Sequence, residues 1–239
     1  QTDLLLLNNE RNMGYTFSVN RGIQAAGNDD VVILNSDTIV PKLWLSTLRA
    51  AGYAESNVAS VTPLTDRPGP FGVLDEKSHR DLDVLSVQKI MAAMASLGSK
   101  GLGKLQEVPT GNGFCMFIRG DALEIVGLFD EDLFPSGYGE ENHFCMMAEQ
   151  HGWKNFVLDN IVVHHSGSAT FGKRSVELKK RGAEIIDKRY PDYKNRIRVF
   201  SGGFFAKRKT PDLLSLNSDS KNILLVNPIL SGGTRITNN

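Results

Sequence analysis

The sequence lacks any excess of charge, since its 239 residues carry 27 basic and 27 acidic side chains. A balanced chain has no general attraction for nucleic acid or for an anionic membrane, so no nucleic-acid partner is predicted. Cysteine is scarce as well: only Cys115 and Cys145 occur, and their spacing is unlike that of a metal-binding motif. A disulfide scaffold is therefore not expected, a reducing compartment fits, and both thiols are predicted to be small buried groups.

Long apolar runs are also missing. No stretch of about 18 apolar residues is present, so no membrane-spanning segment is predicted. No secretion signal opens the chain, and it starts without Met and reaches the leucines at 4–7 almost at once, so we expect a piece of a longer protein. The composition, 41% hydrophobic and 23% charged, is that of an ordinary globular protein with one large α/β domain or one domain plus fragments.

The stretch that organises the prediction is VVILNSDT, residues 31–38. Four apolar, mostly β-branched residues predict a buried strand, which breaks abruptly into small polar residues. In open α/β sheets ligands lie just past the carboxyl ends of such strands, and a carboxylate there can hold a hard cation against phosphate oxygens. The alternative is a loop that only caps the following helix.

The remaining patterns predict alternating strands and helices. The opening strand, helix and strand favour parallel neighbours in one sheet. Leu45 and Leu48 are expected on the inner side of the helix that follows Pro41. Helices are predicted at 15–26, 43–54, 81–97, 121–126, 140–151 and 175–190, strands at 4–7, 31–34, 58–63, 108–119, 153–158 and 161–163, and a loop at 64–79.

Two polar clusters carry candidate chemistry. In FPSGYGEENHF, Glu140 and Glu141 stand side by side at the start of a helix, where acidic residues ordinarily complement the helix dipole. Adjacent carboxylates point in different directions, so one can cap the helix while the other faces a cleft. His164 and His165 follow a strand, and a neutral imidazole there could complete a metal site, although a structural role is the alternative.

The end of the chain predicts further organisation. Residues 201–220 have the composition of a linker, and 221–239 begin with a fresh strand and a glycine turn, as at the start of another α/β domain. The first domain is accordingly predicted to occupy residues 1–200.

Several motifs occur in a fixed order between Asn12 and Lys173: NMGYTFSVNRGIQAA, ILNSDT, EVPTGNGFCMFIRGDALEIVGLFDE, FPSGYGEENHFCMMA, GWK and HHSGSATFGK. Together they resemble the inverting, nucleotide-sugar-dependent glycosyltransferases of family two, and above all the bacterial rhamnosyltransferase-like members that build surface polysaccharides. The tail ILLVNPILSGGTRI is similar to the opening of a GT-B glycosyltransferase. The resemblance implies an α/β, GT-A-like (Rossmann-like) fold with a mixed, mainly parallel sheet flanked by helices, without the usual N-terminal strand-helix-strand unit.

The resemblance also implies roles for particular residues. Asp37 matches the metal-binding aspartate of the family's DxD motif, for Mg²⁺ or Mn²⁺, with Asn35 at the first acidic position. His165 matches the histidine near the metal and the diphosphate, with His164 as the close competitor. Glu141 matches the catalytic base, next to Glu140. The donor is expected near Asn20, Arg21, Asn35, Ser36 and Asp37, and the acceptor near Gly111, Asn112 and Gly113.

The predicted function is therefore inverting transfer of a sugar from a nucleotide-sugar to a saccharide acceptor, in bacterial surface polysaccharide synthesis. The predicted location is the cytoplasm, with a peripheral position at the inner face of the plasma membrane as an alternative. A non-catalytic carbohydrate- or nucleotide-binding module on the same fold is the competing hypothesis. A sugar nucleotidyltransferase fits less well, because it would want a glycine-rich phosphate loop with a basic residue. The mechanism requires Asp37 and Glu141 to meet in a single cleft.

Overall fold

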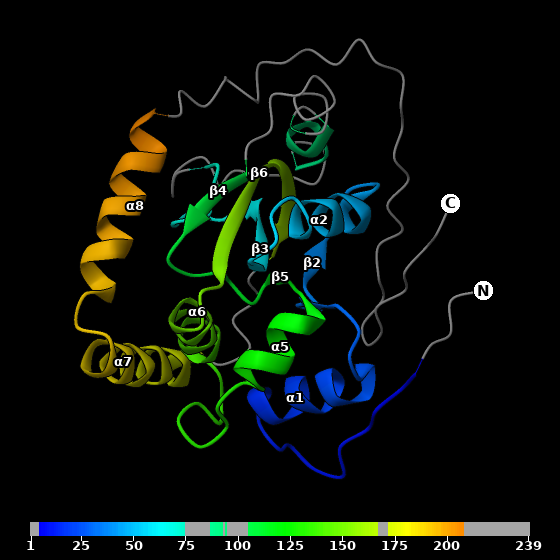
Figure 1. The fold of residues 1–239 in the computed structure, drawn as a ribbon, viewed down its shortest axis with the longest axis vertical. Helices are drawn as coiled ribbons and strands as arrows, with labels where there is room; N and C mark the ends of the chain where they lie inside the picture. The colour runs from blue at the N-terminus through cyan, green and yellow to red at the C-terminus, as the bar shows by residue number, and fades with distance from the viewer. Residues whose placement is uncertain (1–4, 75–86, 93, 95–104, 167–171, 208–239) are drawn as a thin grey trace.

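The computed structural model describes residues 5–74, 87–92, 94, 105–166 and 172–207 (Figure 1). A six-stranded sheet forms the centre of the fold, in the order β1-β5-β3-β6-β2, with β4 paired to β6 beside this path. The strands are β1 Val31–Leu34, β2 Thr38–Ile39, β3 Val58–Thr65, β4 Leu105–Val108, β5 Cys115–Ile118 and β6 Lys154–His165.

The sheet is mixed, but the prediction that it is mainly parallel is wrong. Only β3 and β6 pair in parallel, while β1–β5, β3–β5, β4–β6 and β2–β6 are antiparallel. The physical reason lies in β5, which inserts between β1 and β3 and runs antiparallel to both. The strands β1 and β3 therefore share a direction without being neighbours. The pair of parallel strands predicted at the opening of the chain is not formed, because residues 5–7 are not a strand.

Helices surround the sheet (Figure 1). The helix predicted at 15–26 is confirmed, and residues 87–92 within the range predicted at 81–97 are helical, the remainder of that range lying partly outside the described residues. None of the helices among the described residues is long and apolar enough to cross a bilayer. The helix bounds are α1 Tyr15–Ala26, α2 Trp44–Gly52, α5 Gly120–Val126, α6 Glu140–Gln150, α7 Gly172–Arg189 and α8 Tyr193–Lys207.

Side chains of β5 show how the helices cover the two faces. Cys115 and Phe117 pack in one cluster with Leu48 of α2. Met116 and Ile118 pack in another, which contains apolar side chains of α1, α5 and α6. Successive residues of a strand point to opposite faces, so α2 covers one face and α1, α5 and α6 cover the other. Both cysteines are free and buried, as predicted.

Several predicted elements differ from the observed ones. Leu5, Leu6 and Leu7 form no strand and are exposed, because no neighbouring strand pairs with them among the described residues. The single strand predicted at 108–119 is two strands, β4 and β5, separated by a glycine-containing loop. The strands predicted at 153–158 and 161–163 are one strand, β6, whose pairing with β3 shifts register in the middle. Leu45 is 49% exposed, so only Leu48 faces inward as predicted.

The end of the described chain is also more ordered than predicted. Helix α8 runs through Lys207, into the range 201–220 that the sequence predicts as a linker. Phe200 of this helix packs against Phe71 and the core, and such tertiary packing outweighs the low helix propensity of Gly202 and Gly203. Residues 208–239, which include the predicted second domain at 221–239, lie outside the described residues.

The packing of α7 against the turn before α6 generates a stability prediction. A Cβ added at Gly182 would overlap the carbonyl oxygen of Tyr138, which is backbone and cannot swing aside. Gly182→Ala should therefore lower the free energy of unfolding by about 1–3 kcal/mol. Gly22→Ala is the matched control, because a Cβ there meets nothing within 4 Å, and it should stabilise α1 by about 0.5–1 kcal/mol. Urea unfolding measures both, and equal shifts would contradict the close packing.

Candidate active site

A short strand pairing brings Asp37 to the end of β6. Thr38 of β2 lies opposite His165 of β6, and Asp37 immediately precedes β2. The Oδ1 atom of Asp37 is 3.3 Å from His165 Nε2, and the Asn35 Nδ2 atom is 3.4 Å from the same nitrogen. The Phe114 ring stacks on the His165 imidazole, with centroids 5.5 Å apart and planes at 15°. Residues 130 positions apart in the sequence thus form one group at the sheet edge.

His164 belongs to a different contact. Its Nδ1 is 2.7 Å from Oδ2 of Asp66, whose other oxygen accepts the backbone N–H of His165 at 3.0 Å. Burial alone would raise the pKa of the fully buried Asp66 carboxyl, but the hydrogen bond from His164 and its charge hold that pKa below the usual value. Consecutive strand residues face opposite sides, so only His165 points toward Asp37. Sequence reasoning missed Asp66, although a carboxylate shortly after the strand predicted at 58–63 was an available signal.

The group around Asp37 has the chemistry of a shared metal site. Among the described residues no cluster of three or more His, Cys, Asp or Glu could hold an ion by itself. One carboxylate and one imidazole nevertheless suit Mg²⁺ or Mn²⁺, which commonly take their remaining ligands from substrate phosphates and water. Burial lowers the pKa of His165 despite the nearby Asp37 charge, which favours the neutral imidazole that can bind a metal. The residues present therefore fit the predicted ion.

Two buried carboxyl groups begin α6. Glycines at positive φ form the preceding turn, with Gly137 at 84° and Gly139 at 137°, and a Cβ on Gly139 would overlap the Phe134 ring. Glu140 is only 4% exposed, and within the part of the chain that the structure describes, Oε2 of Glu140 and of Glu141 has no hydrogen-bond partner. Burial raises the pKa of both carboxyls, and repulsion from Glu141 raises that of Glu140 further. Because the two side chains are hydrogen-bonded to each other, the pair holds a proton at a higher pH than an ordinary carboxyl does.

The two glutamates affect different neighbours. Burial raises the pKa of Tyr193, and the charge of Glu141 raises it further. Burial likewise raises the pKa of Tyr138, with Glu140 as the additional cause. Glu141 is thus in electrostatic contact with the start of α8, whereas Glu140 acts on the turn before α6. Tyr15 of α1 is influenced by both carboxylates, after burial as the main cause.

The segment from Thr110 to Phe114 connects the two groups. At one end, Nδ2 of Asn142, the residue after Glu141, donates to the Thr110 hydroxyl at 2.8 Å. At the other end, Phe114 stacks on His165, and its carbonyl accepts the Asn35 backbone N–H at 2.9 Å. The predicted acceptor residues Gly111, Asn112 and Gly113 lie in between. The prediction that Asp37 and Glu141 meet in a single cleft stays a prediction, supported by a segment that contacts His165 at one end and the neighbour of Glu141 at the other.

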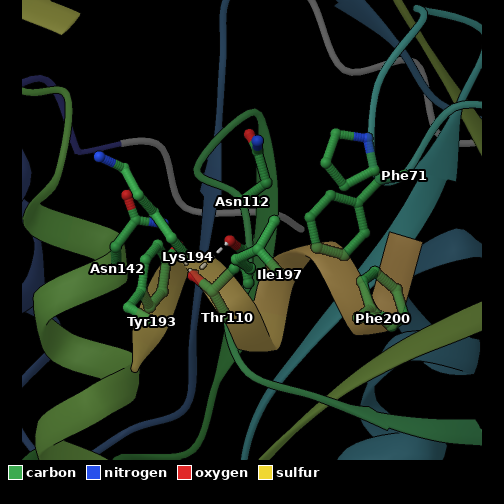
Figure 2. Close-up of a pocket in the computed structure, with 10 residues that line it drawn as sticks. Phe71, Thr110, Asn112, Asn142, Tyr193, Lys194, Ile197 and Phe200 are labelled. Carbon is green, nitrogen blue, oxygen red and sulfur yellow. Dashed lines mark hydrogen bonds between the residues drawn. The ribbon is translucent and has the colours of Figure 1, made fainter. Parts of the chain in front are cut away.

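A pocket of about 230 Å³ opens beside this segment (Figure 2). Its walls come from the loop after β3, the Thr110–Asn112 segment, α6 and α8 (Figure 2). The lining residues are Pro70, Phe71, Thr110, Gly111, Asn112, Asn142, Tyr193, Lys194, Ile197 and Phe200.

The predicted donor residues on α1 are engaged in structural contacts. Asn20 is 3% exposed, and its amide donates to the Phe129 carbonyl at 2.8 Å and accepts the Phe129 N–H at 3.0 Å. Arg21 donates to the Asn8 carbonyl and to Asn9 Oδ1, both at 2.7 Å. Ser36 is exposed in the turn after β1. Direct contacts of Asn20 and Arg21 with the nucleotide-sugar stay predictions. In the structure both side chains make hydrogen bonds within the protein that stabilise the fold.

Comparison with known proteins finds a likeness in fold. No family model and no curated protein matches the sequence. Among solved structures, the fold is similar to that of a glycosyltransferase. This is the mannosyltransferase PcManGT from Pyrobaculum calidifontis, solved in complex with GDP-Man and Mn²⁺, with a TM-score of 0.50 and 17% sequence identity. The match covers 83% of this chain and 51% of that protein, so this chain spans about half of its length.

The buried carboxyl pair generates a prediction on stability and pH. Because burial and Glu141 raise the pKa of Glu140 above its unfolded value of about 4.3, folding becomes less favourable as the pH rises from there toward the raised pKa. Glu140→Gln carries no such cost. We expect it to melt about 2–4 °C above the wild type at pH 8, or roughly 1 kcal/mol, with the gap narrowing toward pH 5.

Calorimetric melting between pH 5 and pH 8 checks this expectation. Glu177→Gln on the exposed surface of α7 is the control and should leave the melting temperature unchanged at both pH values. A Glu140→Gln protein that is less stable than the wild type at pH 8 would contradict the buried-pair interpretation.

Proposed function

We propose that this chain is the catalytic core of an inverting, GT-A-like glycosyltransferase that moves a sugar from a nucleotide-sugar to a saccharide acceptor, in surface polysaccharide synthesis. The observation that carries the proposal is the Thr110–Phe114 segment, which stacks on His165 at one end and at the other end accepts a hydrogen bond from Asn142, the residue after Glu141. A metal-compatible group and a candidate base on either side of one loop are the two parts that this reaction needs. The likeness to a fold solved with GDP-Man and Mn²⁺ supports the same choice.

On the donor side, Asp37 and His165 would hold Mg²⁺ or Mn²⁺. The bound ion would stabilise the negative charge that develops on the leaving nucleoside diphosphate. Phe114, stacked on His165, limits the orientations of the imidazole. Asp66 keeps the end of β6 in place through hydrogen bonds with His164 and the His165 backbone. One side chain that would bind the metal, that of His165, is therefore oriented before any substrate binds.

On the acceptor side, Glu141 would take the proton of the attacking hydroxyl. A carboxyl group whose pKa is raised by burial is a stronger base than an exposed one, which suits proton removal near neutral pH. One base on the face opposite the leaving group gives inversion at the anomeric carbon, by the geometry that applies to inverting glycosidases. Glu140, hydrogen-bonded to Glu141, would share the proton and tune that basicity.

The first test is Glu141→Gln. The variant should lose about 10²–10⁴-fold in transfer rate, because general base catalysis contributes that much, while donor affinity stays within about twofold. Sugar nucleotides are presented in a panel and products are detected by mass, with Glu177→Gln as the control. Unchanged transfer would remove Glu141 from the mechanism. A wild type that binds donors and transfers nothing would favour a non-catalytic carbohydrate- or nucleotide-binding module.

The second test concerns the metal. Asp37→Asn should weaken Mn²⁺ binding by more than about tenfold, since loss of even an outer partner of a ligand typically costs 10–100-fold. Electron paramagnetic resonance of free Mn²⁺ reports binding without any need for turnover. Asp29→Asn, an exposed residue just before β1, should bind as the wild type does. Equal affinity in all three proteins would place the ion elsewhere.

A further inference from the structure

We infer that the pocket between the Thr110–Asn112 segment and α8 binds one uncharged pyranose ring of the acceptor (Figure 2). The inference rests on the proposed function, because it assigns the pocket to the acceptor of that reaction. The sequence predicts the acceptor near residues 111–113, and the pocket adds α8 as a second wall. Helix α8 lies outside the motifs between Asn12 and Lys173. Tyr193, Lys194, Ile197 and Phe200 are the α8 residues that line it.

The pocket has an apolar end. Phe71 and Phe200 lie with ring centroids 6.1 Å apart and planes at 43°, and Ile197 lies beside them (Figure 2). Pro70 also lines the pocket. Both phenylalanines are buried in the core, at 5% and 9% exposure, so this wall is rigid. An apolar, aromatic wall with a few placed polar groups is the usual composition of a small-molecule site. The C–H face of a sugar ring can pack against such a wall.

The opposite end is polar and already ordered. Asn142 donates to the Thr110 hydroxyl at 2.8 Å. Asn112 is held at two points, since its backbone N–H donates to Thr62 Oγ1 at 3.1 Å and its Oδ1 accepts the Phe114 N–H at 3.2 Å. Amides both donate and accept, as sugar hydroxyls require. Groups fixed in advance lose little conformational entropy when a ligand binds.

The polar end is also the end that adjoins the candidate base. Asn142 is the residue after Glu141 on α6, and it lines the pocket. Tyr193, another lining residue, is close enough to Glu141 for its pKa to be raised by that charge in addition to burial. A ring bound with its C–H face on Phe71 and Phe200 would therefore present its hydroxyls toward Asn142 and Thr110, next to the residue proposed as the base.

Size and charge narrow the ligand class. The volume of about 230 Å³ is below the roughly 300–1,000 Å³ of sites for drug-sized ligands, so the pocket suits one ring rather than an extended oligosaccharide. Among the described lining residues Lys194 is the one charged side chain, and it forms an ion pair with Asp187. This described part of the lining therefore offers no unpaired cation to a carboxylate or phosphate, which favours a neutral ring.

The experiment is ligand-observed saturation-transfer NMR on the full chain, with methyl glycosides of glucose, galactose, mannose, rhamnose and N-acetylglucosamine as probes. Ile197→Trp fills the pocket from α8, and Val199→Trp makes the same change on the exposed side of the helix, where Val199 is 64% exposed. We expect at least one glycoside to bind, Ile197→Trp to weaken it by about tenfold or more, and Val199→Trp to leave it unchanged. Asn112→Ala adds no volume and should also weaken binding, which keeps the test valid if Ile197→Trp fails to fold.

Each outcome separates this inference from the proposed function. No binding of any probe, or equal binding by the wild type, Ile197→Trp and Asn112→Ala, would overturn the pocket assignment. Transfer activity whose acceptor KM is the same in the wild type and both pocket variants would also overturn it, while leaving the glycosyltransferase proposal in place. Binding that is lost in the pocket variants, in a protein that transfers no sugar, would support the pocket and refute the proposed function.

Discussion

The buried carboxylate of Asp66 is the constraint on which the candidate site depends. One of its oxygens is hydrogen-bonded to the His164 side chain, and the other accepts the backbone N–H of His165. These two hydrogen bonds fix the position of the end of β6. The pairing of β2 with β6 then brings Asp37 to His165. An ion pair at a completely buried aspartate is costly to break, because one partner would be left as an uncompensated charge. The Asp37–His165 group is consequently positioned by the fold itself.

The glutamates of α6 differ from Asp66 in their hydrogen bonding. One oxygen of each carboxyl, Oε2, has no hydrogen-bond partner among the described residues, and burial holds the pKa values of both carboxyls high. Such groups reduce stability, and carboxyls of raised pKa cluster at functional sites. Glycines make the arrangement possible, since Gly139 leaves room for the Phe134 ring and Gly182 lets α7 approach the preceding turn. The buried glutamate pair therefore lowers the stability of the protein at the residues proposed to act as the base.

The sequence predicted the elements better than their arrangement. The apolar run at 31–34 predicted β1 correctly and placed Asp37 in the turn after it, because that signal is local. The position of β5 between β1 and β3 could not be predicted, since strand order depends on long-range pairing that periodicity does not encode. His165 could be separated from His164 only when the partner strand was known. The α8 wall was missed because its Gly202 and Gly203 resemble a linker, whereas burial of Phe200 decides the structure.

The central claim is that Asp37, His165 and the Thr110–Phe114 segment border one metal-containing site. Paramagnetic relaxation by Mn²⁺, followed in amide NMR spectra at substoichiometric ion, tests it most directly. The account predicts that the amide signals of Asn35, Asn112 and Phe114 broaden first, while those of Val176 and Lys180 on the exposed surface of α7 keep their intensity. Broadening centred on α7, or uniform broadening over the whole chain, would contradict it.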